Sequence, residues 1–479
     1  MHKTLSFNGE KKPWLHLLQG RNKPPFASVT RNILNVPGMP GAHLQSTDTG
    51  VLPINQPVGF VVKDDVHALE LKDELVEWLI TDAPVELQFD DEPGRTYFAV
   101  VQNTMDDFDR FVDQRSGTIQ FLCLDPYAYG PEITEEFTSD TAIIAKQGSA
   151  AAQPVFELEV LAPVTFAMVQ NQNEEYMMIG QPTDADTSTV NTKTLMLEER
   201  GQTLDTWNDT PTEIDGGTVA GYLGTDNAGI TVPSYGSDMP GWHGPALIKE
   251  VTPAQDFEVE MMLEGEASGD QTFRIEFYLY DEGMNVIGKM AILDKTLNVN
   301  RKVAEGRIGG YVGRQENYLI SSQNYSYGWP FYFGMLRMRR VGSIFEFYVT
   351  RIANNTKHVY SLKETYVDNN NEYAGKLKYV QIHIGKYADT ARAYGPKIHY
   401  IKAFELAEAT TDQTPYIAYT GDIITFDHVN EEILINGEER KDLKDFGGSF
   451  FDLHKGENQL IMHPPTSFLG NVKYRPRYR

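Results

Sequence analysis

Short runs in which apolar and polar residues alternate dominate the chain. Runs at 154–160, 165–169 and 175–180 are examples, and Gly, Pro, Asn or Asp residues separate such runs. Alternation with a period of two between turn residues is typical of antiparallel β-sandwiches and barrels. The sequence has no fixed-period repeat, so propellers and solenoids are not expected. We therefore expect a mainly β chain.

One segment has the period of an α-helix instead. Between 66 and 80 the apolar residues fall on one helical face, at Leu71, Leu75, Trp78 and Leu79. Asp64 and Asp65 precede this segment and can cap its free N–H groups. Pro84 lies just beyond it and cannot continue a helix. A hairpin is predicted next, at 86–101, around an Asp/Pro/Gly turn.

Composition suggests that a large region between two polar stretches is separate from the rest. The polar stretches are 181–194 and 407–414, and the region between them is rich in aromatic residues and glycine. At about 200 residues it is long enough to form a sandwich of its own.

Charge and cysteine content exclude several classes of protein. The 479 residues include 42 Lys and Arg against 67 Asp and Glu, so the net charge is 42 − 67 = −25. Such a charge opposes wrapping nucleic acid or docking on an anionic membrane through a basic face. The one cysteine, Cys123, lies in an apolar run and is expected to be buried, without a disulfide. The sequence has no apolar stretch of about 18 residues, so no membrane-spanning helix is predicted. It has no signal-peptide pattern, so we expect synthesis in the cytoplasm.

The common motifs of catalysis and metal binding are missing from the sequence. It contains no P-loop, no G-x-S-x-G and no H-E-x-x-H, so we predict no catalytic residue, metal or cofactor. His383 and His399 lie in strand-like runs and are interpreted as core or surface residues. Glu258 and Glu260 alternate with apolar residues and are interpreted as a solvent-facing strand edge. A hydrolase remains the alternative, because carboxylates from distant strands can converge.

Two aromatic clusters are the candidate binding residues. Exposed aromatic rings stack on the faces of sugars, while neighbouring polar groups bind hydroxyls. The candidate carbohydrate-binding residues are Trp242, Tyr325, Tyr327 and Trp329. Packing in the core of a sandwich is the competing explanation, and the sequence leaves both open. The basic tail 471–479 either pairs with an acidic face of a neighbouring subunit, binds nucleic acid, or is a disordered terminus.

The order of several short motifs is similar to a known family. The motifs are Phe7-Asn8-Gly9, 36–41, Glu77-Trp78-Leu79, 93–97 and 125–129, followed near the end of the chain by 421–427, 435–437, 450–453 and 456–458. In this order, across about 1–182 and 415–479, the chain resembles the distal tail proteins of long-tailed phages that infect Gram-positive bacteria.

The resemblance implies a fold and a domain division. It implies an N-terminal β-sandwich with one α-helix and a protruding hairpin (1–135), and a split galectin-like C-terminal β-sandwich (136–182 and 415–479). The excess length, 183–414, looks like an inserted jelly-roll (lectin-like) carbohydrate-binding module. Insertion at an exposed loop is the tolerated way to add a domain.

The resemblance also implies a function without enzymatic activity. We expect a structural tail-tip (baseplate hub) protein whose homohexameric ring joins the tail tube protein to the tail-associated tip protein and a receptor-binding protein. The insert is expected to bind a host cell-wall saccharide during adsorption. No membrane insertion and no specific nucleic-acid binding are expected. The alternatives are a cell-wall polysaccharide hydrolase with a jelly-roll catalytic domain and a free carbohydrate-binding adhesin.

Overall fold

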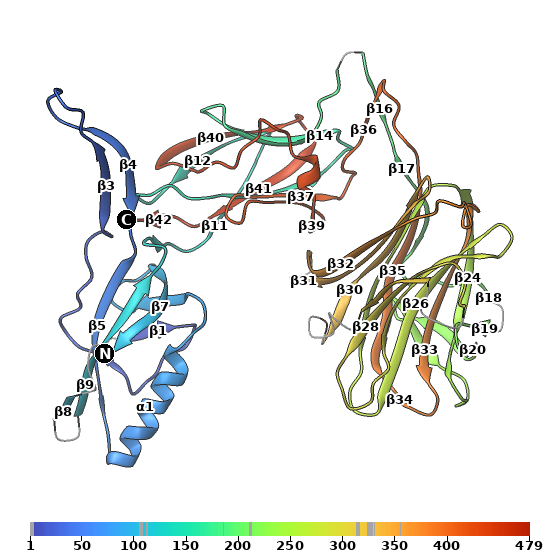
Figure 1. Ribbon diagram of the computed structural model, residues 1–479, viewed down its shortest axis with the longest axis horizontal. Coiled ribbons are helices and arrows are strands. Elements are labelled where there is room, and N and C mark those ends of the chain that lie inside the picture. The colour runs from blue at the N-terminus through green and yellow to red at the C-terminus, as the bar shows by residue number, and fades with distance from the viewer. Residues whose placement is uncertain are drawn as a thin grey trace. The chain divides into compact units, whose positions relative to one another are not determined.

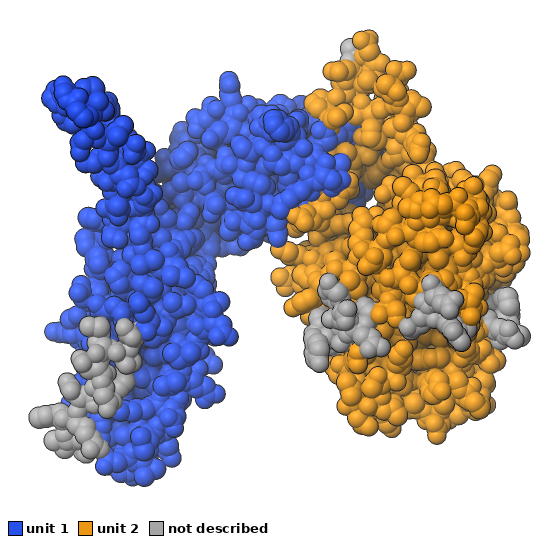
Figure 2. All heavy atoms as spheres, in the orientation of Figure 1, with its two compact units in different colours: residues 1–180, 420–433, 441–479 blue, residues 181–419, 434–440 orange. Residues whose placement is uncertain are grey.

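The computed structural model describes residues 4–104, 109–111, 114–184, 186–209, 213–312, 317–322, 329, 331–354 and 356–479. These residues form two compact units (Figure 2). Unit 1 contains 1–180, 420–433 and 441–479, and unit 2 contains 181–419 and 434–440. Strands make up nearly all the regular structure, which confirms the mainly β fold. The three-domain division at 135, 182 and 414 stays a prediction.

A nine-stranded sheet forms the N-terminal part of unit 1. Its main path is β1 (Leu5–Phe7), β6 (Val85–Phe89), β7 (Thr96–Thr104), β9 (Gln114–Cys123), β5 (Leu52–Val61) and β2 (His16–Leu17). Three short strands pair beside it: β8 (Asp109–Phe111), β10 (Ala128–Tyr129) and β42 (Arg477–Tyr478). The predicted hairpin is confirmed as β6 paired with β7. Cys123 is fully buried, as expected.

The helix α1 (Asp65–Leu79) packs against this sheet through the predicted face. The side chain of Asp64 caps its first turn by accepting a hydrogen bond from the His67 backbone N–H at 2.8 Å. The Trp78 indole N–H donates to the Phe7 carbonyl at 3.0 Å, and the two rings meet edge to face. Burying each large apolar side chain of this face stabilises the fold by about 1.5–3 kcal/mol.

A two-stranded hairpin, which we call the arm, extends from unit 1. It consists of β3 (Val29–Leu34) and β4 (His43–Thr49), which pair with each other and with no third strand among the described residues. All thirteen residues of the two strands are exposed. Figure 1 shows the arm extending past the end of the sheet, and Figure 2 shows it as a narrow projection. This confirms the protruding hairpin.

A sandwich of two sheets follows in sequence. The six-stranded sheet has the order β11 (Ile133–Glu136), β41 (Phe468–Tyr474), β13 (Val155–Val160), β37 (Ile423–Asp427), β38 (Glu432–Ile435) and β39 (Glu438–Glu439). The four-stranded sheet has the order β12 (Thr141–Lys146), β40 (Gly456–His463), β14 (Phe166–Asn171) and β15 (Tyr176–Gly180). Alternate residues of β13, such as Phe156 and Leu158, are fully buried. A short 3-10 helix lies at Lys441–Leu443.

Unit 2 is a second and larger sandwich. Its eight-stranded sheet runs β21 (Tyr222–Thr225), β22 (Ile230–Ser234), β35 (Tyr394–Leu406), β25 (Phe257–Glu266), β30 (Tyr332–Val341), β31 (Ile344–Ala353) and β32 (Lys357–Val367), with β17 (Lys193–Glu199) beside β35. Its eleven-stranded sheet runs β19 (Glu213–Ile214), β20 (Gly217–Val219), β23 (Trp242–Gly244), β33 (Leu377–Tyr387), β26 (Gln271–Asp281), β27 (Val286–Asp294), β28 (Lys302–Ile308) and β29 (Tyr318–Ser322), with β18 (Asn208–Asp209), β24 (Ala246–Ala254) and β34 (Ala391–Arg392) beside it.

The two sheets of unit 2 share one core. Phe257, Val259 and Met261 of β25 contribute to it from one sheet, and Phe273 and Ile275 of β26 contribute from the other. The two ends of the long segment 181–419 of this unit lie beside each other, because β16 (Ser188–Val190) pairs in parallel with β36 (Gln413–Pro415). Neighbouring ends are what the predicted insertion of 183–414 requires.

Two sequence interpretations are wrong. Glu258 and Glu260 do not lie on a strand edge, because β25 has β35 on one side and β30 on the other, and Glu258 is 8% exposed. The basic tail is not a disordered terminus, because β42 pairs with β10. Three of its cations bind carboxylates of the same unit: Lys473 with Glu157, Arg475 with Glu86 and Arg477 with Asp125.

Candidate functional site

The outward side of the eleven-stranded sheet in unit 2 carries an unusual set of buried charges. Successive residues of a strand point to opposite sides, so β26 sends Phe273, Ile275 and Phe277 to the core and Arg274, Glu276 and Tyr278 outward. The outward residues are nevertheless at most 4% exposed. We call this side of the sheet the polar face.

The strand register aligns the polar face in rows across four strands. One row places Gln381, Tyr278, Lys289 and Arg307 side by side on β33, β26, β27 and β28. The next row places His383, Glu276, Ala291 and Glu305 beside it. Charged residues on neighbouring strands thus come within ion-pair distance, although they are far apart in the sequence.

Glu276 is the centre of the ion-pair network. Its carboxylate lies 2.9 Å from Arg274 Nε and 2.8 Å from Lys289 Nζ. His383 Nδ1 lies 2.8 Å from Glu276 Oε1. Lys289 also lies 3.2 Å from Glu305 Oε2. Buried charges are tolerated only when they are paired in this way.

A carboxylate from a separate hairpin completes the network. Asp215 lies in the turn between β19 and β20, and its Oδ2 atom pairs with Arg307 and lies 3.5 Å from Lys289 Nζ. Its carbonyl accepts a hydrogen bond from Arg274 at 2.9 Å, and its N–H donates to the Tyr278 hydroxyl at 3.3 Å. The turn of this hairpin therefore covers part of the polar face.

An apolar patch borders the charges. Ala291, Leu293 and Val303 form a small buried cluster on the same side of the sheet, and Trp242 packs against it. The Arg274 guanidinium lies 4.9 Å from the centre of the Trp242 ring. Tyr387 meets Trp242 edge to face and is 47% exposed. Apolar rings beside placed polar groups are typical of a small-ligand site.

The electrostatics of the polar face favour binding over acid catalysis. Burial opposes the charge on Glu276, but the attraction of Arg274 and Lys289 outweighs it and holds the pKa of Glu276 well below its ordinary value. Burial lowers the pKa of His383 to about 4, so its ring is neutral at pH 7. A glycosidase acid needs a carboxyl whose pKa is raised. Glu276 does not meet that requirement.

Several polar atoms of the face are buried without a hydrogen-bond partner in the described protein. They include Nη2 of Arg274, Nη2 of Arg307, Nε2 of Gln381 and Nε2 of His383. A buried polar atom without a partner costs free energy, so each such atom calls for a partner that the described residues do not supply.

The sequence-predicted residues occupy different places. Trp242 is half-buried on β23 at the border of the polar face. Trp329 is fully buried in the core of unit 2, where its N–H donates to the Tyr360 carbonyl at 3.2 Å. Tyr325 and Tyr327 lie outside the described residues. Binding of saccharide by these four residues stays a prediction.

The sequence analysis missed the charged residues of the polar face. Their signal was the alternation Arg274-x-Glu276-x-Tyr278, together with Lys289 and the pair Glu305-x-Arg307. Charged residues at every second position are ordinarily a solvated strand face. Only the hairpin that lies over them changes that interpretation.

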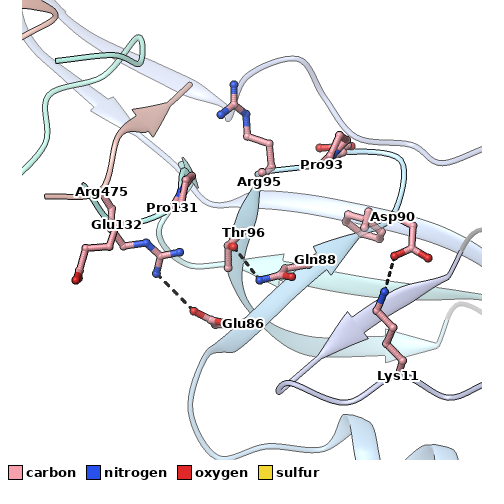
Figure 3. A pocket seen from close by; sticks show the side chains of 13 residues that line it. Lys11, Glu86, Gln88, Asp90, Pro93, Arg95, Thr96, Pro131, Glu132 and Arg475 are labelled. Atoms are coloured by element: carbon pink, nitrogen blue, oxygen red, sulfur yellow. Dashed lines mark hydrogen bonds and ion pairs between the residues drawn. The ribbon is translucent and has the colours of Figure 1, made fainter. Parts of the chain in front are cut away.

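Unit 1 contains a separate hollow of about 660 Å³. Figure 3 shows it between the β6–β7 turn and the C-terminal tail, with Lys11 paired to Asp90 and Arg475 paired to Glu86. Arg95 and Glu132 also line it. Its charged residues lie at the surface, and we assign it no ligand.

Two classes of feature are not found in the part of the chain that the structure describes. None of its helices is long and apolar enough to span a membrane. No three side chains among its described His, Cys, Asp and Glu residues gather in a way that would hold a metal ion.

Comparison with known families identifies both ends of the chain. Residues 10–123 match the phage tail protein RIFT-related domain, and residues 398–478 match the siphovirus-type tail component, C-terminal domain. The distal tail protein of Bacillus phage SPP1 is 34% identical over 77 residues, which cover 15% of this chain and 28% of that protein. The match thus spans less than a third of that relative.

Two solved structures show lower similarity. The crystal structure of SPP1 Dit is 18% identical with a TM-score of 0.34, and the match covers 37% of this chain and 74% of that one. The CBM2 module of the evolved Dit of Lactobacillus casei BL23 phage J-1 is 13% identical with a TM-score of 0.39, and the match covers 46% of this chain and all of that one.

The two family domains occur in the order that the sequence motifs indicated, and residues 181–397 of unit 2 lie between them. Both matched domains are those of siphovirus tail proteins, and together with the partial match to the SPP1 distal tail protein they support a siphovirus distal tail protein, a component of the virion tail.

Proposed function

We propose that this protein is the hub of the tail tip, and that six copies form a ring joining the tail tube to the tip and receptor-binding apparatus. The observation that carries this proposal is the pair of family domains at the two ends of the chain. A structural hub needs no catalytic residue, metal or cofactor. The partners we propose are further copies of this chain, the tail tube protein, the tail-associated tip protein and a receptor-binding protein.

The arm supports self-assembly. Its exposed apolar side chains include Ile33 and Leu44, each 56% exposed, and Met39 at the loop, 54% exposed. A monomer gains nothing from holding such side chains in water, and apolar surface of this kind marks an interaction site. A second copy of the chain is the occupant we propose, because closed rings form when each subunit presents one surface to the next.

We further propose that the insert binds a host cell-wall saccharide through the polar face. The support is the combination on one side of one sheet of Trp242 and Tyr387 with buried Arg, Glu, Gln and His side chains. Rings can stack on the C–H faces of a sugar while the polar groups bind its hydroxyls.

Mass measurement of the purified protein, with negative-stain images of the same peak, tests assembly. A species of six times 54.0 kDa with ring-shaped particles is expected. A monomer at every concentration, also in the presence of tail tube protein, would contradict the ring. Sedimentation with isolated host cell walls tests the insert, and a protein that stays in the supernatant would contradict wall binding.

One observation favours a second candidate function, the polysaccharide hydrolase. Glu258 and Glu260 face the same side of β25. Burial raises the pKa of Glu260. The pKa of Glu258 is lowered instead, because the attraction of Lys193 and Arg337 outweighs the effect of burial. Two neighbouring carboxyl groups with well-separated pKa values are typical of a catalytic acid and its partner carboxylate. Release of reducing sugar from walls, lost in Glu260→Gln, would establish this function; its absence at high protein concentration would exclude it.

A further inference from the structure

The Asp215 carboxylate occupies a position where cations converge. Arg307 pairs with its Oδ2 atom, Lys289 lies 3.5 Å from the same atom, and Arg274 binds the carbonyl of the same residue. These three cations come from three neighbouring strands, β28, β27 and β26. The residue that all three bind, Asp215, lies outside those strands, on a short hairpin.

The charges of the polar face balance only while Asp215 is present. Three cations (Arg274, Lys289, Arg307) stand against three carboxylates (Glu276, Glu305, Asp215), so the sum is 3 − 3 = 0. Without Asp215 the sum becomes 3 − 2 = +1, in a region where the cations are at most 4% exposed. A buried excess of positive charge calls for an anion.

The cations also have unused donors. Nη2 of Arg274 and Nη2 of Arg307 are buried and have no acceptor among the described protein atoms. An acceptor-rich group with more than one oxygen, such as a carboxylate or phosphate, would use them in the paired geometry that guanidinium groups favour. A single Asp side chain leaves them unused.

The hairpin that carries Asp215 is a small edge element. Strand β19 has two residues and is the outermost strand of its sheet, and β20 has three. Gly217 fits closely against β23, where a Cβ atom would overlap the Trp242 carbonyl oxygen. Few backbone bonds hold such an element, so it can open without disturbing the sandwich.

We propose that Arg274, Lys289 and Arg307 form a seat for an anionic group of the saccharide ligand, and that the Asp215 carboxylate fills this seat in the unliganded chain. The inference rests on the proposed saccharide binding by the polar face. It narrows the ligand class to saccharides that bear a carboxylate or a phosphate. Binding then exchanges one anion for another, and the hairpin moves away.

The first test measures affinity at fixed ionic strength with three probes: poly(glycerol phosphate), polygalacturonate and neutral dextran. The full chain is compared with Asp215→Asn and with the matched control Asp238→Asn. Asp238 is an exposed carboxylate paired with Lys386 at 2.6 Å in the same unit, so both variants change the net charge equally. If the open hairpin is a minor state of about 10%, Asp215→Asn raises affinity for an anionic probe about tenfold, whereas Asp238→Asn leaves it unchanged.

A second variant opens the hairpin with all charges intact. Gly217→Ala introduces the Cβ atom that overlaps the Trp242 carbonyl, so β20 must move from β23. We expect the same gain for the anionic probe and none for dextran. Arg307→Gln added to Asp215→Asn should abolish the gain. Thermal unfolding identifies which variants remain folded, and the inference is tested on those.

The outcomes separate this inference from the proposed function. If affinity increases for poly(glycerol phosphate) alone, the anionic group of the ligand is a phosphate. If it increases for polygalacturonate alone, that group is a carboxylate. The seat would be overturned by an equal gain in affinity in Asp238→Asn, by an equal gain in affinity for dextran, or by no gain in either hairpin variant. Wall binding by the unaltered chain would still support the proposed function in each of these cases. If the unaltered chain and all variants fail to bind host walls, the proposed function itself fails.

Discussion

At the scale of single residues, two tryptophans from similar sequence surroundings have different environments. Trp242 and Trp329 both lie beside glycine and proline in aromatic clusters, and both were candidates for stacking on a sugar. Trp242 borders the polar face, whereas Trp329 packs in the core against Tyr332. The sequence did not separate them, because burial depends on segments that are distant along the chain.

Alanine substitution should therefore affect the two tryptophans differently. Trp242→Ala should weaken wall binding by at least about tenfold, because a central aromatic contact is commonly worth 2 kcal/mol or more. Trp329→Ala should lower the free energy of unfolding by about 3–5 kcal/mol, as expected for a large core deletion. Wall sedimentation and chemical denaturation measure the two effects. Tyr222→Ala, which removes a ring that is 61% exposed on β21, is the control.

His428 predicts a pH dependence of stability in unit 1. Burial beside Phe156 and Phe451 lowers the pKa of His428 from 6.5 to about 4. The unfolded chain therefore takes up a proton before the folded chain does, and stability that is complete above pH 6.5 is lost as the pH falls toward 4. The loss is up to about 3 kcal/mol.

Urea unfolding between pH 7 and pH 4 measures this dependence. His383 also has a pKa near 4, so the wild type is compared with His428→Leu, which removes one titrating group only. The difference in unfolding free energy between the two proteins should change in favour of the variant as the pH falls. A constant difference across this range would contradict the prediction.

At the scale of elements, periodicity was sufficient where structure is local. The helix at 66–80 and the hairpin at 86–101 were predicted and found as α1 and as β6 with β7. The arm entered as an implication of the resemblance, and its thirteen strand residues are all exposed. An element that no third strand pairs with among the described residues needs a partner to bury its apolar residues.

The arm gives a prediction on assembly. Ile33 and Leu44 are cross-strand partners, and replacing both with Asp should shift the protein from ring to monomer. Each substitution removes the burial of an apolar side chain, which is worth about 1.5–3 kcal/mol, and places a carboxylate in an apolar contact. Light scattering after gel filtration measures the mass. Thr47→Asp, on the same exposed hairpin, is the control and should leave the mass unchanged; equal effects would argue against an apolar contact.

At the scale of the whole molecule, the chain combines two tail-protein domains with a second compact unit, a large sandwich. The family domains lie at 10–123 and 398–478, and most of unit 2 lies between them. Its ends lie side by side at β16 and β36. Assembly and wall binding should therefore be separable.

Replacing 183–414 with a short Gly/Ser linker should abolish wall binding and retain ring formation. The ring should lose mass in proportion to the deleted residues, and wall sedimentation should fall to background. Circular dichroism confirms that the shortened chain is folded. Retained wall binding would place the saccharide site in unit 1, outside the insert.

The sequence by itself determined the mainly β class, the position of α1 and the hairpin that follows it, and it located two polar stretches at 181–194 and 407–414. Each of these depends on periodicity or composition within one segment, where short-range geometry decides the outcome. Charge alternation in β26 was also visible, but alternation states only that two sides of a strand differ. It does not state whether the polar side meets water.

Only the tertiary structure decided that question. Strand register placed Lys289 and Arg307 beside β26, and a hairpin more than fifty positions earlier placed Asp215 over them. The same long-range packing buried Trp329 and left Trp242 at a site border. Ion pairs and burial depend on distance in space, and between strands that distance is set by pairing and not by sequence separation.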